Sequence, residues 1–220
     1  MTQPTALSMR PATMADVHRI VEIHAVAFHR TFMAAFGRKR YEDGLRVMAE
    51  VWRRQGSAGL HGMWVAEHDG LVVGTITMRT RGAHWLPASV PVEWLFVRAL
   101  GVVRGMYALH ALSFIEYHVA HDDLYITDVA VDERFQRQGV GRAMLAHAVA
   151  YAERQHLCTV SLYVDAANVA ACSLYLGSGF VVERTHYSLM GWILLRQSRW
   201  LLLRRCVSSV AMNEHVSIRS

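Results

Sequence analysis

The apolar positions in the first part of the chain predict a strand, two helices and a hairpin. Residues 6–10 read as a short strand. The apolar stripe that follows has helical spacing and consists of Val17, Ile20, Val21, His24 and Phe28. A second stripe, with Leu45, Met48 and Trp52, predicts a helix over residues 41–54. Residues 62–67 and 71–79 then read as two strands around Asp69-Gly70, a dipeptide typical of a tight hairpin turn.

The rest of the pattern predicts strands alternating with helices. A fourth strand covers residues 124–131, a helix covers 139–155 and a strand covers 158–164. Another helix begins at Asn168, and residues 180–188 and 198–205 read as closing strands. Residues 84–122 carry a long apolar stretch with scattered charges, where we expect one or two inserted helices. This order of elements is that of an α/β sandwich.

A glycine-bearing turn follows the fourth strand and leads directly into a helix. It reads Gln136-Arg137-Gln138-Gly139-Val140-Gly141-Arg142. Glycines let backbone approach a ligand closely, and the open N–H groups of a helix start favour an anion. Arg134, Arg137 and Arg142 add positive charge. The turn has neither the Lys-Ser/Thr pair of a Walker loop nor the spacing of the dinucleotide fingerprint, so it predicts another kind of phosphate site or simply a tight turn.

A second motif lies downstream and reads Asn168-x-x-Ala171-x-x-Leu174-Tyr175-x-x-x-Gly179-Phe180. Taken singly, Asn168 is a helix N-cap, Tyr175 a half-buried aromatic and Gly179 a C-cap. Taken together with Gln136-x-x-Gly139-x-Gly141, the motif resembles the GNAT superfamily of acyl-CoA-dependent N-acyltransferases. The resemblance is strong over residues 124–185, generic over 7–80, and absent over 84–122 and after Met190.

The resemblance implies a fold and a set of binding residues. The fold would be a mixed, mostly antiparallel central sheet flanked by helices, with a helical insert before the fourth strand. The backbone of Val129, Ala130 and Val131 would pair with the pantetheine arm of coenzyme A, which Asn168 also reaches. The diphosphate would be held by the backbone N–H groups of Gln136, Arg137, Gln138, Gly139, Val140, Gly141 and Arg142.

The implied reaction is acetyl transfer from acetyl-CoA, as co-substrate, to a primary amine. Tyr175 would lie near the thioester sulfur, where its phenol can protonate the departing thiolate. A backbone N–H around Val129 would stabilise the oxyanion. Alternation along the fourth strand predicts that Asp128 shares a face with Ile126 and Ala130. Asp128 is our candidate base, with the alternative that it pairs with a nearby arginine and holds the sheet.

The identity of the acceptor is not determined by the sequence, and both small-molecule and peptide amines are candidates. The predicted loop over residues 28–41 would bind it, and Arg38, Lys39 and Arg40 there favour a neutral or acidic acceptor. Two alternatives to acetyl transfer also stay open. One is transfer of a longer acyl chain, with the insert lining an acyl tunnel. The other is a non-catalytic module that senses acyl-CoA.

Length, composition and charge limit the classes of protein to which this chain can belong. The 220 residues, of which 53% are hydrophobic, suit a single domain over residues 1–205 with a tail over 206–220. Three cysteines and the lack of a signal-peptide pattern predict a reducing, cytoplasmic setting. The net charge of +5 suits a phosphorylated ligand without implying nucleic acid. We expect no metal, although His118-x-x-His121 precedes Asp122 and Asp123, and no membrane span. Contact of the insert with a membrane surface is a lesser alternative, and a homodimer is left open.

Overall fold

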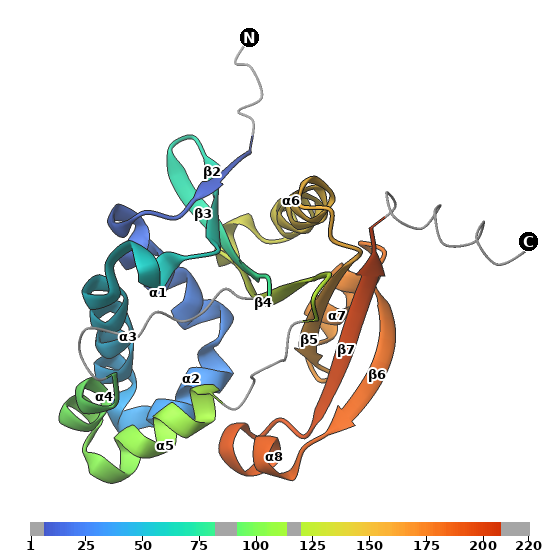
Figure 1. Ribbon diagram of the computed structural model, residues 1–220. Coiled ribbons are helices and arrows are strands. Elements are labelled where there is room, and N and C mark those ends of the chain that lie inside the picture. Colours follow the sequence, from blue (N-terminus) through green and yellow to red (C-terminus); the bar gives the residue numbers. More distant parts are fainter. Residues whose placement is uncertain (1–6, 82–91, 114–119, 208–220) are drawn as a thin grey trace, which may run out of the picture.

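The strands form one sheet in the order β1-β2-β3-β4-β5-β7-β6, shown in Figure 1. The structure is a computed structural model that describes residues 7–81, 92–113 and 120–207. All neighbouring strands run antiparallel except β4 and β5, which run parallel. The strands are β1 (Ser8–Pro11), β2 (Met63–His68), β3 (Leu71–Arg79), β4 (Asp123–Val131), β5 (Thr159–Asp165), β6 (Val181–Tyr187) and β7 (Arg199–Cys206).

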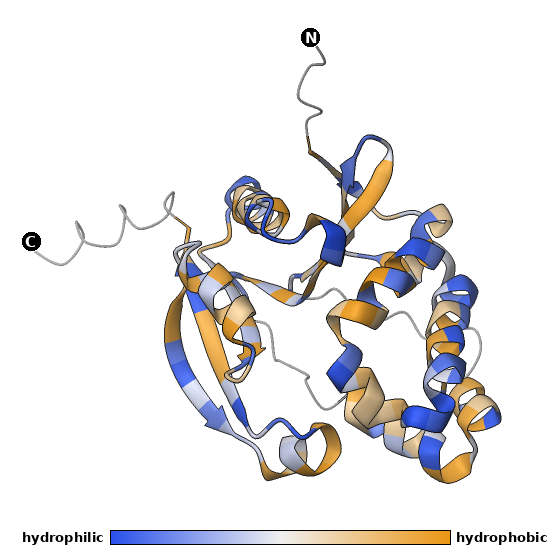
Figure 2. Ribbon diagram, turned by 180° about the vertical axis from the view of Figure 1, so that it is seen from behind, coloured by the Kyte–Doolittle hydropathy of each residue, from blue (hydrophilic) through white to orange (hydrophobic). Residues whose placement is uncertain are grey.

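Helices flank this sheet on both faces. α6 and α7 bury their apolar sides with one face, and α1 and α3 with the other, in two separate core clusters. Figure 2 shows that α1, α3 and α6 carry both hydrophobic and hydrophilic residues, as expected for helices with one buried side. The predicted fold class, a mixed and mostly antiparallel sheet flanked by helices with an insert before the fourth strand, is confirmed. The helices are α1 (Val17–Ala27), α2 (His29–Phe36), α3 (Tyr41–Gln55), α4 (Val92–Leu100), α5 (Val102–Ser113), α6 (Val140–Arg154), α7 (Val169–Leu176) and α8 (Leu189–Leu195).

β4 and β5 pair with each other over only part of their length. The pairs run from Asp123 with Thr159 to Ile126 with Leu162. Beyond them, residues 128–131 of β4 pair with β3, and residues 163–165 of β5 pair with β7. Figure 1 shows the two strands turning away from each other. We call the space between these two segments the wedge. Backbone groups that face the wedge have no partner strand there.

An extra residue in β4 changes which side chains share a face. Two successive residues of β3 pair with Asp128 and Ile126, which leaves Thr127 over as a β-bulge. The prediction that Ile126, Asp128 and Ala130 share a face is therefore wrong. Ile126 packs in the core cluster covered by α6, whereas Ala130 packs in the cluster of α1 and Asp128 approaches His24 of α1.

The structure also differs from the prediction at two helices. The predicted loop over residues 28–41 is mostly α2, because Phe32, Ala35 and Phe36 recur at helical spacing and are buried. Gly37, with a φ of 74°, ends this helix. α8 lies between the two closing strands, where the pattern predicted no element, and Ser188 caps it by accepting from the amide of Gly191 at 2.9 Å.

The predicted insert contains two helices, α4 and α5. They pack with α2, α3 and α8 around a third core cluster, which includes Phe36, Phe96 and Leu195. The Tyr107 hydroxyl of α5 donates to the Leu194 carbonyl of α8 at 2.7 Å. Arg104 Nη2 of α5 donates to the Ala34 carbonyl of α2, also at 2.7 Å. The insert is thus integrated into the fold rather than appended to it.

Some sequence-based interpretations fall outside the described residues. These include the amino-terminal segment over residues 1–6, residues 82–91 and 114–119 of the insert, and nearly all of the predicted tail. The chain stays in the sheet to Cys206, and Val207 is buried, with its N–H donating to the Cys158 carbonyl at 2.9 Å. Within the three described ranges, every helix is too short or too polar to span a bilayer.

Candidate functional site

A buried carboxylate anchors the segment that follows β4. Asp132 caps the short 3-10 helix η4 (Glu133–Phe135) by accepting from the Arg134 amide at 3.0 Å. Its two oxygens also accept from the Arg134 guanidinium, at 3.2 and 2.7 Å, and from Arg19 of α1. Hydrogen bonds from Arg134, and to a smaller extent from Arg19, hold the pKa of this carboxyl well below its usual range. The segment is therefore tied to α1 as well as to β4.

The turn that follows presents a run of unpaired amides. Arg137 and Gly139 both have positive φ, of 59° and 87°, which turns the chain tightly into α6. Ala143 is the first residue of the helix whose N–H reaches a helix carbonyl, that of Gly139, at 2.9 Å. The amides of residues 137–142 come before it and, in the part of the chain that the structure describes, donate to no backbone oxygen. We call residues 136–142 the amide loop.

Glycine is needed at the two glycine positions of the amide loop for different structural reasons. A Cβ added at Gly139 would meet nothing within 4 Å, so its positive φ is what requires glycine. A Cβ at Gly141 would lie 2.9 Å from Leu174 Cδ2. Gly141 therefore lets α6 and α7 pack closely, so a close approach of a ligand is not needed to explain glycine at this position.

The side chains of the amide loop leave its amides uncovered. Gln136 Nε2 turns back to the Val131 carbonyl at 3.3 Å, and Gln138 Nε2 turns back to the Arg134 carbonyl at 2.8 Å. Arg137 and Arg142 are exposed. Arg134, by contrast, is committed to Asp132. Two of the three predicted arginines are thus placed where a bound anion can use their charge.

The wedge begins just before the amide loop. Val129 and Val131 pack toward the cluster of α6, and Ala130 is buried in the cluster of α1. The backbone of these three residues pairs with β3 on one side and faces the wedge on the other. An extended chain lying in the wedge can therefore hydrogen-bond to β4 as a further strand does.

α7 brings the second motif to the opposite side of the wedge. Asn168 is the N-cap of α7, because its Oδ1 accepts from the Ala171 amide at 3.1 Å, and its amide group is exposed. Tyr175 is buried against Phe180, with ring centroids 6.1 Å apart in an edge-to-face arrangement. Burial, and then the negative charge of Asp128, raise the pKa of the Tyr175 phenol, so it stays protonated. Gly179, with a φ of 84°, completes the turn after the helix.

Asp128 meets a histidine that sequence reasoning placed only on the apolar stripe of the first helix. Asp128 Oδ1 lies 3.7 Å from His24 Nε2, and the same nitrogen lies 2.8 Å from Thr75 Oγ1 of β3. On its exposed side, Asp128 Oδ2 accepts from Thr127 Oγ1 at 3.1 Å. Within the described residues no arginine lies at ion-pair distance from Asp128, so the alternative that an arginine neutralises it has no support there. The sequence signal that could have identified His24 is its position as a polar residue on an otherwise apolar helix stripe.

The structure brings together most of the predicted residues but not the basic trio. Arg38, Lys39 and Arg40 are exposed and lie beyond α2, and Arg40 Nη1 donates to the Ala99 carbonyl of the insert at 3.4 Å. The eight residues of α2 separate them from α1 and His24. Within the described residues, the contacts of Arg40 are to Asp43 of α3 and to the insert, and no ion pair joins the trio to Asp128.

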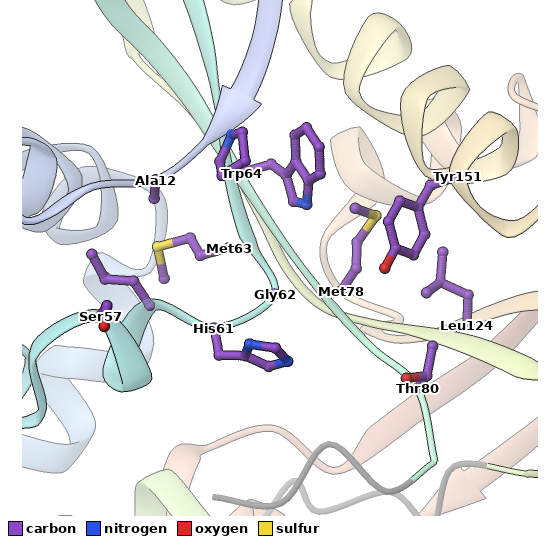
Figure 3. Close-up of a pocket in the computed structure, with 12 residues that line it drawn as sticks. Ala12, Ser57, His61, Gly62, Met63, Trp64, Met78, Thr80, Leu124 and Tyr151 are labelled. Atoms are coloured by element: carbon purple, nitrogen blue, oxygen red, sulfur yellow. The ribbon is translucent and has the colours of Figure 1, made fainter. Parts of the chain in front are cut away.

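A separate cavity of about 330 Å³ lies away from these residues, at the start of β4. Figure 3 shows Trp64, Met78, Leu124 and Tyr151 around it, with His61 at one side. None of the predicted site residues and no charged side chain lines it. Without a cationic arginine or lysine it is less suited to a diphosphate than the amide loop, so we place the candidate site at the wedge.

A metal centre does not emerge from the described ranges, which contain no group of three or more potential ligands among histidine, cysteine and carboxylate side chains. His118 of the candidate histidine pair lies outside those ranges. Asp123, beside that pair in sequence, is buried and accepts from Thr159 Oγ1 at 2.7 Å and from Ser161 Oγ. These bonds join β4 to β5 where the two strands still pair.

Comparison with known proteins gives one family and consistent relatives. The family model described as Acetyltransferase (GNAT) family matches residues 17–180. The ribosomal protein bS18-alanine N-acetyltransferase of Escherichia coli (strain K12) is 37% identical over 78 residues, which are 34% of this chain and 53% of that protein. The mycothiol acetyltransferase of Kocuria rhizophila is 45% identical over 62 residues, 28% of this chain and 20% of that protein. The chain thus spans about half the length of the first relative and less of the second.

Solved structures share the fold at lower identity. PaiA N-acetyltransferase from Thermoplasma acidophilum, in complex with coenzyme A, has a TM-score of 0.58 at 12% identity and covers 91% of this chain and 99% of that chain. The ribosomal-protein-S18-alanine N-acetyltransferase from Escherichia coli has a TM-score of 0.54 at 18% identity, covering 94% and 98%. The family match extends over α1, β4, the amide loop and α7. The chain therefore belongs to the Acetyltransferase (GNAT) family.

Proposed function

We propose that this chain transfers an acetyl group from acetyl-CoA to a primary amine, by direct attack while both substrates are bound. The observation that carries the proposal is the wedge between β4 and β5. The amide loop follows β4 at this point, and Asp128 is close enough to Tyr175 for its charge to act on the phenol. The names of the relatives, which are N-acetyltransferases, support an acetyl donor and an amine acceptor.

The residues present suit acetyl-CoA. The diphosphate would accept from the unpaired amides of residues 137–142, with Arg137 and Arg142 close by in sequence and exposed. The pantetheine arm would lie along the backbone of Val129, Ala130 and Val131. The exposed amide of Asn168 would reach it from the other side of the wedge. Within the described ranges, the amides of residues 137–142 donate to no backbone oxygen, so they are free to meet a bound anion.

The chemistry needs one proton acceptor and one proton donor. The amine nitrogen attacks the thioester carbon, a C–N bond forms, the C–S bond breaks, and the amine loses a proton. Asp128, partly exposed with its side chain at 23%, would take that proton. The departing thiolate would take a proton from Tyr175, whose phenol is protonated at neutral pH, and the phenolate would then regain a proton from solvent. Holding both reactants side by side contributes most of the rate, because effective molarities are worth roughly 7–11 kcal/mol.

The first acceptor to test is a peptide that begins with alanine, because relatives are named for acetylating the alanine of a ribosomal protein. Small amines form the second group. A spectrophotometric assay of released thiol, with acetyl-CoA and each acceptor, measures transfer, and a panel of longer acyl-CoA donors measures chain-length preference. Absence of turnover with all acceptors, despite tight acetyl-CoA binding, would favour a sensor module instead.

Two glycine substitutions test where acetyl-CoA binds. Gly139 and Gly101 have nearly the same φ, 87° and 83°, and a Cβ at either would meet nothing within 4 Å. Gly139→Val and Gly101→Val therefore carry similar backbone strain, but only the first alters the amide loop. Isothermal titration should show at least tenfold weaker acetyl-CoA binding for Gly139→Val and unchanged binding for Gly101→Val. Equal affinities for the two variants would remove the amide loop from the proposal.

A further inference from the structure

The proposed reaction leaves a polar cluster behind Asp128 unused. His24, Thr75 and Thr77 come from α1 and β3 and lie on the same face of the sheet as Asp128. His24 is 4% exposed, and Thr75 and Thr77 are 0% and 4% exposed. Buried polar side chains are costly unless they are hydrogen-bonded, so such a cluster beneath a candidate base calls for a reason.

The surroundings of His24 keep its imidazole neutral. The ring packs edge-on against Phe28 of α1 at 5.2 Å and Trp52 of α3 at 5.7 Å between centroids. Thr75 faces it from β3, and Asp128 faces it from β4. Burial lowers the pKa of His24, and the negative charge of Asp128 opposes this effect. Among the described residues, Asp128 is the one charged group that acts on the ring.

The hydrogen-bond pattern shows where one more proton fits. Asp128 Oδ1 is buried and has no hydrogen-bond donor among the described residues, and Thr77 Oγ1, on the residue paired with Asp128, is equally unsatisfied. His24 Nε2 lies 2.8 Å from Thr75 Oγ1 and 3.7 Å from Asp128 Oδ1. A neutral ring that accepts from the Thr75 hydroxyl carries no hydrogen on Nε2. Protonation there would supply the donor that Oδ1 lacks.

We infer that His24 shares with Asp128 the proton taken from the acceptor amine, so that the two side chains act as one base. The inference rests on the proposed function. The amine loses one proton as its C–N bond forms, Asp128 receives it, and it passes to His24 Nε2. The net charge of the pair changes from −1 to zero, and the proton later returns to solvent. Because His24 acts through Asp128, it is a positioning residue rather than a catalytic one.

The first test compares pH profiles of turnover. A pair that shares a proton titrates as a unit, so removing one member moves the midpoint of the pair. For His24→Gln we expect kcat to fall about tenfold to a hundredfold and the acid limb of the profile to move to lower pH by about one unit or more. Acetyl-CoA affinity should stay unchanged. His18→Gln, at an exposed histidine of the same helix, is the matched control and should keep the wild-type profile.

If His24 only stabilised the fold, the His24→Gln variant would behave differently. The loss of His24 would lower the free energy of unfolding and leave the pH at which turnover declines unchanged, and that outcome would overturn the inference. Circular dichroism first confirms that His24→Gln is folded. If wild-type protein binds acetyl-CoA but acetylates no amine, the proposed function fails, and the pairing of the two side chains is then judged by a measurement that needs no turnover.

That measurement is the NMR titration of His24 in protein with isotope-labelled histidine. The His24 signal is assigned by its loss in His24→Gln. In Asp128→Asn the carboxylate charge is gone, so the titration midpoint of His24 should fall below its wild-type value, because that charge opposes the effect of burial. An unchanged midpoint means that the two groups are not coupled, and it overturns the inference whether or not an acceptor is found.

Discussion

Replacing Asp132 by asparagine tests whether the amide loop depends on one buried carboxylate. Asp132 is 6% exposed and binds Arg19 of α1 and Arg134 of η4. Asparagine keeps the shape and can still cap η4, since both residues are good N-caps. It removes the negative charge and leaves both guanidinium groups without their partner. The loop should then be held less firmly, although its sequence is unchanged.

The magnitude follows from burial and exposure. Removing one partner of a buried ion pair costs roughly 3–5 kcal/mol. The Arg19 and Arg134 side chains are 23% and 62% exposed, so water screens both and can solvate them after the change. We therefore expect a loss of about 2–3 kcal/mol in the free energy of unfolding. For a chain of this size, this corresponds to a fall in Tm of about 4–12 °C.

Urea unfolding of wild type, Asp132→Asn and Asp69→Asn measures this difference. Asp69 is exposed in the hairpin turn with a φ of 53°, where asparagine fits, so Asp69→Asn should change stability by less than about 0.5 kcal/mol. The pKa of Asp132 is lowered in the folded state, so its contribution is present above the ordinary aspartate pKa of about 3.9 and is lost as the pH falls below that value. The difference in free energy of unfolding between wild type and Asp132→Asn should therefore shrink as the pH is lowered. Equal stability of the two proteins at neutral pH would refute the reasoning.

Three further substitutions probe the other side of the wedge. Tyr175→Phe should lower kcat about a hundredfold, in a thiol-release assay, with acetyl-CoA affinity unchanged; an unaltered kcat would assign the proton donor elsewhere. Gly141→Val should cost about 1–3 kcal/mol in urea unfolding, because its Cβ would lie 2.9 Å from Leu174 Cδ2, and adding Leu174→Ala should recover part of the loss. No recovery in the double variant would point to strain in the turn instead. Asn168→Ala should cost about 1 kcal/mol through the lost cap of α7, and a smaller change would mean that the first turn is held by packing alone.

Local signals in the sequence account for most of the elements. Asp69 and Gly70 both adopt positive φ, 53° and 76°, in the hairpin that this dipeptide predicts. The helix predicted over residues 41–54 is α3, and that over 139–155 is α6, because their apolar stripes are long and regular. α2 was available to the same reasoning through Phe32, Ala35 and Phe36.

Long-range geometry accounts for what the pattern could not predict. The bulge at Thr127 depends on the register of β4 against β3, and nothing in the residues of β4 signals it. One extra residue turned Asp128 toward α1 instead of toward the side of Ile126. The approach of His24 to Asp128 joins residues far apart in the chain, so the apolar stripe predicted that His24 is buried but not what it faces. The roles of the predicted site residues remain predictions that the experiments above address.

The parting of β4 and β5 also bears on how quickly a spent cofactor molecule could leave. Sheet pairing between these strands stops after Ile126 and Leu162, so an arm lying beyond that point interrupts no rung of the ladder when it enters or departs. Exchange of product for fresh donor therefore needs no melting of secondary structure. If acetyl-CoA binds as proposed, the rate of exchange would depend on how tightly the amide loop holds the phosphates rather than on opening of the sheet.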